Sequence, residues 1–231
     1  VPARDIRMSA PAYAELQVTS HFSFLRGASS AEELFAAAAA MGIEALAVTD
    51  RNTLAGIVRA HEAAKEAGVR LIVGCRLDLA CGMSVLVYPT DRAAYSRLCR
   101  LLSLGKGRAG KARCHLEWDD LVAYGEGLIV VLAPDLADET CGLRLRRLRD
   151  AFGDRAYLGL TLRRRPNDQM RLWELSTLAA GLGVPTVVTN DVLFHEPGRR
   201  ILQDVVTAIR HNLTVDALGT RRDRHADRYL K

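Results

Sequence analysis

The segment AELQVTSHFSFLRGASSAEEL, from Ala14 to Leu34, decides how the fold is interpreted. Its first five residues are typical of a short strand, and a turn follows them. Ser30 and Glu33 then stand in the spacing of a capping box, which predicts the start of a helix. Gly42 is expected to close that helix, since glycine is favoured just past a helix C-terminus. The segment therefore predicts a strand, a turn and a capped helix.

The same alternation continues along the chain. Between most of the apolar runs lie stretches with helical periodicity, one of which has Asn52 as its candidate cap. Apolar strands joined by helical crossovers predict an α/β fold with a parallel sheet covered on both faces, and seven of them favour a closed, TIM-like (β/α) barrel. We expect one domain over 13–231, after a leader or expression remnant at 1–12. The predicted strands are AELQV, ALAVT, LIVG, VLVY, LIVVL, YLGL and TVVT.

Composition is that of an ordinary globular protein, with 231 residues, 49% hydrophobic and 26% charged. The apolar runs end well before the roughly 18 residues of a membrane span, and the first residues lack the apolar region of a secretory signal. We therefore expect a cytoplasmic protein without membrane contact. The cysteines are odd in number and form no C-x-x-C pair, so we expect reduced thiols and no zinc site or disulfide framework. They are Cys75, Cys81, Cys99, Cys114 and Cys141.

Basic residues form two clusters, in a chain whose net charge is +5. GKGRAGKAR (105–113) is a glycine-punctuated basic loop, and TLRRRP (161–166) is the second cluster. Either could contact phosphates, because Lys and Arg neutralise a nucleic-acid backbone without regard to sequence. A solvated loop on a basic protein is the alternative. The candidate phosphate contacts are Lys106, Arg108, Lys111 and Arg113.

Polar residues gather at the predicted carboxyl ends of the strands, which is where α/β barrels assemble their sites. Convergence of carboxylates and arginines there is typical of a catalytic cleft, and also of a buried ion-pair network. The residues are Glu15, Gln17, Thr19, Asp50, Arg51, Arg76, Asn190 and Asp191.

Six ordered segments carry a resemblance to a known family: YAELQVTSHFSFLRGASS, ALAVTDRNTLAG, LIVGCRLDL, CHLEWDDL, GLIVVLAPD and VVTNDVLFHEPGRR. Together they resemble the PHP (polymerase and histidinol phosphatase) domain of bacterial C-family DNA polymerases, in particular the error-prone DNA polymerase III alpha-subunit type. The resemblance runs from about Tyr13 to Lys231 and implies a seven-stranded (β/α) barrel of the PHP fold. In active members it also implies metal ions at the strand ends that hydrolyse phosphoesters.

The resemblance indicates which positions held the family's metal ligands, and most have changed. The opening His-x-His falls on Glu15 and Gln17, and the aspartate of the next turn falls on Arg26. The family's Thr-Asp-His keeps Asp50 but has Arg51 for its histidine.

Later ligand positions have changed in the same way. A glutamate falls on Arg76, a histidine on Met83 or Ser84, and a cysteine or histidine on Pro134. The final Asp-x-His keeps Asp191, while its histidine is Leu193.

Three of these positions are arginine, which has no lone pair to donate and stays protonated. We therefore expect a degenerate metal site, with no catalytic residue, metal ligand or cofactor in this domain. The three arginines are expected to pair with Glu15, Asp50 and Asp191 instead. The alternative is an active Zn- or Mn-dependent phosphoesterase or proofreading 3′–5′ exonuclease with a rearranged ligand set, in which His21 and His195 serve as substitute ligands.

The resemblance also implies a context. The chain is expected to be an N-terminal fragment of a damage-tolerant, translesion DNA polymerase that uses Mg²⁺ at a separate polymerase site. Its expected role is a structural scaffold for replication and repair synthesis, with the remaining polymerase domains, DNA held through them, and accessory mutasome proteins as partners.

Trp118 and Trp173 are expected to anchor the core, because each sits in helical apolar spacing.

Overall fold

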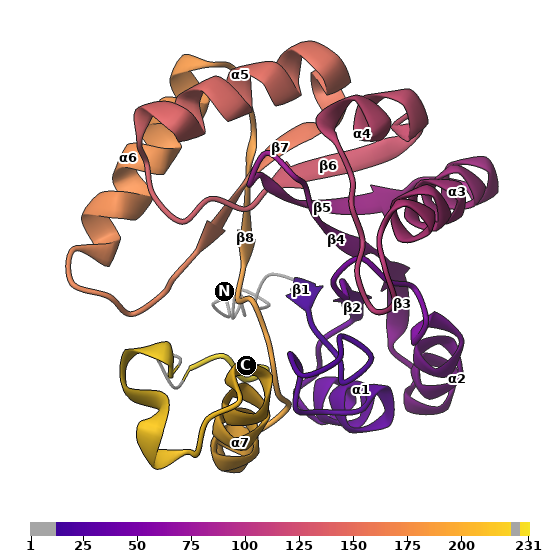
Figure 1. The fold of residues 1–231 in the computed structure, drawn as a ribbon, viewed down its shortest axis with the longest axis vertical. Coiled ribbons are helices and arrows are strands. Elements are labelled where there is room, and N and C mark those ends of the chain that lie inside the picture. The colour runs from indigo at the N-terminus through magenta and orange to yellow at the C-terminus, as the bar shows by residue number, and fades with distance from the viewer. Residues whose placement is uncertain (1–12, 223–226) are drawn as a thin grey trace, which may run out of the picture.

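The computed structural model describes residues 13–222 and 227–231, so the expected leader at 1–12 lies outside the described residues. The described chain is a mixed α/β fold with two sheets (Figure 1). The first sheet contains three parallel strands, β1 (Ala14–Val18), β2 (Ala45–Val48) and β3 (Arg70–Val73). The second contains five, in the order β4 (Cys75–Asp78), β5 (Ser84–Pro89), β6 (Leu128–Leu132), β7 (Ala156–Thr161) and β8 (Thr186–Thr189).

The expectation of seven parallel strands in one closed barrel is therefore corrected. The described residues form eight strands in two sheets, and β5 runs antiparallel to both β4 and β6. The sequence interpretation missed β4, whose residues CRLD alternate between buried and half-buried and follow β3 after a single residue. That residue is Gly74, where a Cβ would lie 2.8 Å from Thr49 Cγ2 and 2.9 Å from the Tyr88 ring. Glycine is needed there because the two sheets approach closely.

Single bridges link the two sheets on both sides of the molecule. Val18, at the end of β1, bridges Val192, which follows β8. Arg51, just beyond β2, bridges Arg76 in β4, and the Asn52 N–H donates to the Arg76 carbonyl at 2.8 Å. Both bridges lie beyond or at the carboxyl ends of parallel strands, and they bring the residues expected at the site together.

The first helices show which capping predictions hold. Helix α1 (Ala31–Ala40) has the predicted capping box of Ser30 and Glu33. Helix α2 (Ile57–Ala67) begins after Gly56, so the prediction of Asn52 as its cap is wrong. Asn52 has a φ of 51° and its side-chain oxygen accepts from the Asp78 N–H at 3.1 Å. It belongs to a turn that ties the end of β2 to β4.

The remaining helices are α3 (Arg92–Arg108), α4 (Trp118–Tyr124), α5 (Glu139–Phe152), α6 (Asp168–Gly181) and α7 (Arg200–His211), with 3₁₀ turns at Gly153–Arg155, Pro197–Arg199 and Asp216–Arg221. The larger core packs α3–α6 against the five-stranded sheet, and the smaller one packs α1 and α2 against β1 and β2. Helix α7 packs on the turn after β1, where Gln203 Nε2 and Arg210 Nη1 each donate at 2.9 Å to the carbonyl oxygens of Arg26 and Leu25. None of the helices in the described ranges has the length and apolar character of a membrane span.

The two tryptophans, Trp118 and Trp173, differ in how far they are buried. Trp118 is buried and meets the Phe152 ring edge-on with centroids 6.3 Å apart, which confirms its place in the core. Trp173 is 67% exposed, so the core prediction for it is wrong. Helix α6 buries Arg171 and Leu175, and a residue midway between them points to the other face. All five cysteines are free thiols, as expected.

Candidate functional site

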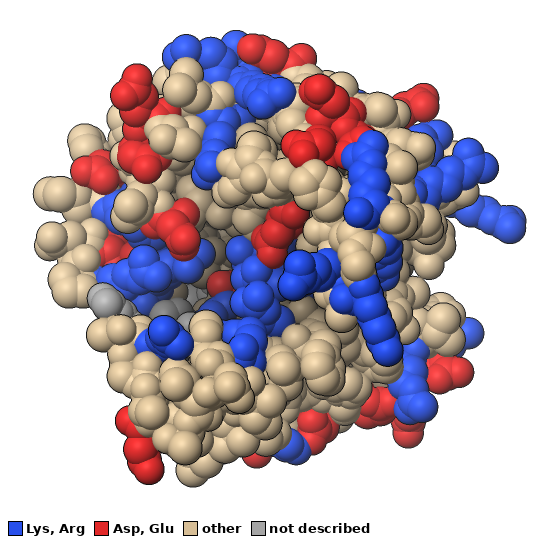
Figure 2. Space-filling model, viewed as in Figure 1, with Lys and Arg blue, Asp and Glu red and all other residues tan. Residues whose placement is uncertain are grey.

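A small pocket of about 160 Å³ lies where the ends of β1 and β2 meet β4 and the segment after β8. Its lining contains five arginines and one carboxylate, and we call it the arginine pocket. Figure 2 shows Lys and Arg gathered around a hollow in the middle of one face of the molecule. The charged lining residues are Arg26, Arg51, Arg76, Arg210, Arg228 and Asp191.

Asp191 is the carboxylate of this pocket, and both of its oxygens are occupied. Arg228 Nη2 lies 2.6 Å from Oδ2, and Gln17 Nε2 donates to Oδ1 at 2.8 Å. Burial alone would raise the pKa of Asp191, but Arg228, Arg76 and Arg163 together hold this pKa well below its usual range. Asp191 is therefore a fully paired carboxylate anion.

Gln17 extends this network across the sheet ends. Its Oε1 accepts from Thr189 Oγ1 at 2.8 Å, and Thr189 in turn lies 2.7 Å from Thr161 Oγ1. Both polar atoms of the amide are thus used within the protein, and the residue is 2% exposed. Coordination of an ion by Gln17 would compete with these hydrogen bonds.

Glu15 and Asp50 are buried but do not pair with arginine, which corrects the prediction. Glu15 accepts from Tyr13 Oη at 2.7 Å and from the backbone N–H groups of Gln17 and Asn190 at 2.8 and 3.1 Å. Asp50 accepts from the N–H and hydroxyl of Ser20 at 2.8 and 2.7 Å. Burial raises the pKa of each carboxyl to about 7. Neutral hydrogen-bond donors therefore hold these two acids.

The acid that pairs with the predicted arginines is Asp78, which sequence reasoning missed. Arg51 Nη1 lies 2.6 Å from Asp78 Oδ2, and Arg76 Nε lies 3.3 Å from Oδ1. Ser84, one of the two alternative histidine positions, donates to the same Oδ1 at 2.7 Å. Residue spacing could have identified Asp78 as a partner, because it stands two residues after Arg76 and shares its strand face. The sequence interpretation ended the strand before both residues.

Positive charge remains in excess. Burial and the neighbouring Arg76 lower the pKa of Arg51 to about 10, and burial and Arg210 lower the pKa of Arg26. Among the ion pairs of the described residues none includes Arg26. Arg228, which neutralises Asp191, lies 37 residues further along the chain, and no sequence signal marks it.

The other predicted positions lie apart from this network or only line it. Leu193 lines the arginine pocket, whereas Pro134 lines a separate pocket of about 150 Å³ that also includes Arg76. His195 Nδ1 lies 2.8 Å from Ser29 Oγ, and the His21 ring stacks on Phe22 at 4.7 Å. Met83 is buried in the larger core.

A larger cleft of about 580 Å³ shares Arg26 and Arg51 with the arginine pocket, and we call it the basic cleft. Three predicted phosphate contacts, Lys106, Lys111 and Arg113, line it. The fourth, Arg108, is not in the lining and pairs with Asp120 at 2.5 Å. Residues 105–108 form the last turn of α3, so the predicted loop begins only after them.

The second basic cluster is largely engaged within the protein. Arg163 pairs with Asp135 at 2.9 Å, and Arg164 pairs with Asp227 at 3.0 Å. These two arginines carry less unpaired charge than Lys106, Lys111 and Arg113 of the basic cleft. The basic cleft is therefore the better of the two candidate phosphate sites.

The residues of the arginine pocket do not fit the metal cluster that the family resemblance implies. Both Asp191 oxygens already accept hydrogen bonds, from Gln17 and Arg228, and arginines stand at three positions where the resemblance implies metal ligands. A unit positive charge about 4 Å from an arginine costs roughly 4 kcal/mol at an effective dielectric near 20, and a divalent ion doubles that. The donor set favours an anion over a cation.

Comparisons with known proteins agree with the fold. A family model described as the PHP domain matches residues 15–160. The chain is 73% identical to error-prone DNA polymerase 1 of Agrobacterium fabrum, over 97% of this chain and 20% of that protein. It is 44% identical to the error-prone DNA polymerase of Caulobacter vibrioides, over 97% of this chain and 21% of that protein. The chain thus spans about a fifth of the length of the curated relatives it matches.

Solved structures share the architecture at low identity. A putative metal-dependent phosphoesterase from Bifidobacterium adolescentis aligns with a TM-score of 0.60 and 15% identity, over 79% of this chain and 88% of that one. A lesion-specific endonuclease from Pyrococcus furiosus aligns with a TM-score of 0.54 and 14% identity, over 78% and 48%. At these identities the likeness shows the fold alone. The family match and the fold agree, and this chain belongs to the PHP domain family.

Proposed function

We propose that this chain is the PHP domain of an error-prone, translesion DNA polymerase, and that it acts there as a non-catalytic structural domain. The observation that carries the proposal is the charge of the arginine pocket, where five arginines surround one fully paired carboxylate. In this proposal fixed guanidinium groups supply the positive charge that bound metal ions supply in active family members. The degenerate metal site then needs no cofactor, and Mg²⁺ belongs to the separate polymerase site.

The chemistry of the pocket supports this role. Hydrolysis of a phosphoester needs an activated water, which a metal ion or a general base provides. Asp191 is held as an anion by Arg228, and its oxygens are already used. Glu15 and Asp50 have raised pKa values, but neither lines the arginine pocket. The pocket stabilises negative charge, and the one carboxylate in its lining, Asp191, is already paired.

A second feature supports a role within a longer polypeptide. Helix α7 buries Gln203, Asp204 and Thr207, while Ile201 and Ile209 on its outer face are 76% and 58% exposed. An apolar helix face turned to solvent is typical of an interface. We propose that the remaining polymerase domains cover it, because the curated relatives are about five times as long as this chain.

The α7 interface has a direct test. Replacing Ile201 and Ile209 by serine leaves the melting temperature of the isolated chain within about 2 °C, since neither side chain is buried in it. In the full-length polymerase the same pair lowers thermal stability, whereas serine at Val58, which is 67% exposed on α2, does not. Equal effects of the two changes in the full-length protein contradict the proposed interface.

We extend the proposal to the barrel-like arrangement of the two sheets and to the cellular setting of the domain. The two sheets act as an interrupted TIM-like barrel whose seams are the bridges Val18–Val192 and Arg51–Arg76. The domain works in the cytoplasm with the other polymerase domains, with DNA held through them, and with accessory mutasome proteins.

The alternative is a metal-dependent phosphoesterase or 3′–5′ exonuclease with a rearranged ligand set. The observation in its favour is that two buried carboxyls, Glu15 and Asp50, remain without an arginine partner. Activity assays separate the two proposals. With Mn²⁺, Zn²⁺ or Mg²⁺ added, the chain is expected to release no phosphate from p-nitrophenyl phosphate and to leave a labelled DNA 3′ end intact. Metal-dependent hydrolysis that is lost in Asp50→Asn and Asp191→Asn would establish the alternative.

A further inference from the structure

The basic cleft is the largest hollow among the pockets described above, and the proposed structural role makes no use of it. We infer that it binds single-stranded nucleic acid, with phosphates along the segment after α3 and a base against Phe24. This inference goes beyond the proposed function, which requires no ligand. It stands on the charge, the aromatic side chain and the shape of the cleft.

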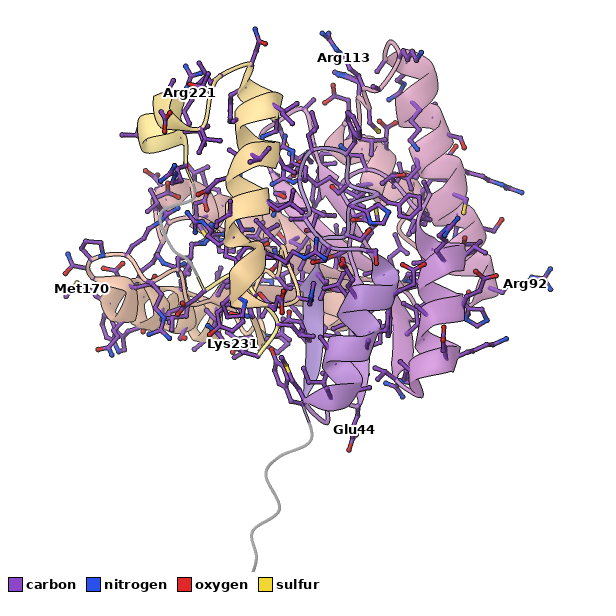
Figure 3. The ribbon with its side chains drawn as sticks, turned by 90° about the horizontal axis from the view of Figure 1, so that it is seen from below. Glu44, Arg92, Arg113, Met170, Arg221 and Lys231 are labelled. Carbon is purple, nitrogen blue, oxygen red and sulfur yellow. The ribbon has the colours of Figure 1, made fainter. Side chains whose placement is uncertain are left out.

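Charge is the first observation. The lining contains five cations and one carboxylate, Asp78, which is already paired with Arg51 and Arg76. Within the described ranges no ion pair includes Lys106, Lys111 or Arg113. Figure 3 shows Arg113 at the opposite end of the molecule from Glu44, which directly precedes β2, so the cations lie on the side toward which β1 and β2 run. A phosphodiester backbone would neutralise this excess.

The second observation is an exposed aromatic ring. Phe24 lines the basic cleft and is 81% exposed, although it stands among buried and half-buried residues of the turn after β1. Phe24 belongs to none of the hydrophobic core clusters of the described residues, so core packing does not account for its ring. Unpaired bases stack on such rings, and the interaction tolerates any base because every base has a π face.

Backbone shape is the third observation. Gly110 lines the cleft, and a Cβ built there would meet nothing within 4 Å. Packing therefore does not require glycine at this place. A glycine lets a ligand approach the backbone closely, which suits a phosphate that accepts from N–H groups.

Together these observations select one occupant. An anionic membrane is flat on this scale, and cations inside a concave cleft would reach it poorly. An acidic peptide would satisfy the cations but gives no reason for the exposed ring of Phe24. A duplex keeps its bases stacked and out of reach. A single strand presents phosphates and free bases together, so it uses all three features of the basic cleft.

The test measures fluorescence anisotropy of a labelled 15-nucleotide oligo(dT) with the 231-residue chain in EDTA, between 20 and 200 mM salt. The cleft variant is Lys106→Ala/Lys111→Ala/Arg113→Ala. The matched control, Lys65→Ala/Arg92→Ala/Arg100→Ala, removes the same charge from exposed positions outside the cleft lining. Three lost phosphate contacts are expected to reduce the slope of log affinity against log salt by about 2, at roughly 0.7 per contact on a single strand.

Phe24→Ala is expected to weaken binding about tenfold and leave the salt slope unchanged, because it removes stacking and no charge. The duplex of the same sequence is expected to bind more weakly, and polyglutamate of equal charge is expected to compete poorly. The inference is overturned if wild type shows no binding, if cleft and control triples weaken binding equally, if Phe24→Ala has no effect, or if polyglutamate competes as well as oligo(dT). A parallel incubation of the probe with Mn²⁺ in place of EDTA, analysed on a gel, separates this inference from the structural role, since metal-dependent cleavage refutes the latter and leaves binding intact.

Discussion

The ion pair between Arg228 and Asp191 allows the clearest quantitative prediction. Its side chains are 14% and 5% exposed, and the two atoms in contact lie 2.6 Å apart. Replacing Arg228 by methionine keeps much of the side-chain length and leaves Asp191 buried without its main partner. Breaking a buried pair in this way typically costs about 3–5 kcal/mol. Arg76 and Arg163 still act on Asp191, so we expect the lower end, about 3 kcal/mol.

Thermal denaturation measures this loss. For a domain of this size 1 kcal/mol shifts the melting temperature by about 2–4 °C, so Arg228→Met should melt roughly 6–12 °C lower. The control is Asp191→Asn, which keeps an oxygen to accept from Gln17. The two changes combined should destabilise by clearly less than their sum, because each removes the same contact.

The stability lost in Arg228→Met also depends on pH in a defined direction. The folded-state pKa of Asp191 is lowered, so its stabilising effect is present above the unfolded value near 4 and disappears as pH falls through the folded pKa. In Arg228→Met burial raises this pKa, and the deficit relative to wild type should therefore shrink as pH falls from 7 toward 4. A melting temperature within about 2 °C of wild type, or effects that simply add in the double variant, would refute the assignment of Arg228 as the charge that holds Asp191.

Three further predictions concern the surroundings of the site. Arg76→Ala should destabilise by about 1–2 kcal/mol in a thermal melt, since Asp78 is about a third exposed, and Arg76→Glu should be worse because it sets an acid beside Asp78; two variants that melt within a degree of wild type would contradict this. The free energy of unfolding of Glu15→Gln, measured by urea denaturation, should rise relative to that of wild type by up to roughly 3 kcal/mol as pH rises from about 4.5 to 7. The reason is that burial makes the ionised form of Glu15 costly in the wild type. A difference in stability that does not depend on pH would contradict this prediction. Gly105→Ala should destabilise by about 1–3 kcal/mol, since its Cβ would lie 2.6 Å from Leu116, whereas Gly107→Ala in the same helix meets nothing and should stabilise slightly; equal effects would show that α3 packs differently.

Local patterns in the sequence predicted a good part of this fold. The capping box of α1 depends on residues three apart, and it forms as expected. Strands with continuous apolar runs were found, and the plainest of these signals came from β2, β5 and β6, which are buried almost throughout. Strand β4 was missed because Arg76 and Asp78 interrupt its apolar pattern, and the antiparallel pairing of β5 depends on contacts that no local pattern reports.

The composition of the site was easier to predict than its pairing. The excess of arginine follows from residue types at aligned positions, whereas ion pairs depend on which side chains meet in space. Arg228 reaches Asp191 across 37 residues, and Asp78 competes for Arg51 and Arg76 from a strand that was not anticipated. The prediction that Trp173 lies in the core was wrong for a related reason, since helical apolar spacing does not show which face of α6 packs on the sheet.

Metal content tests the central claim most directly, which is that arginine charge stands in this domain where other family members hold metal ions. The chain is purified without chelator, equilibrated with Zn²⁺ and Mn²⁺, passed through a desalting column and analysed for bound metal. The account predicts well below one equivalent, and no difference between wild type and the variants Asp50→Asn and Asp191→Asn. One or more equivalents of metal in wild type, lost in these two variants, would contradict it.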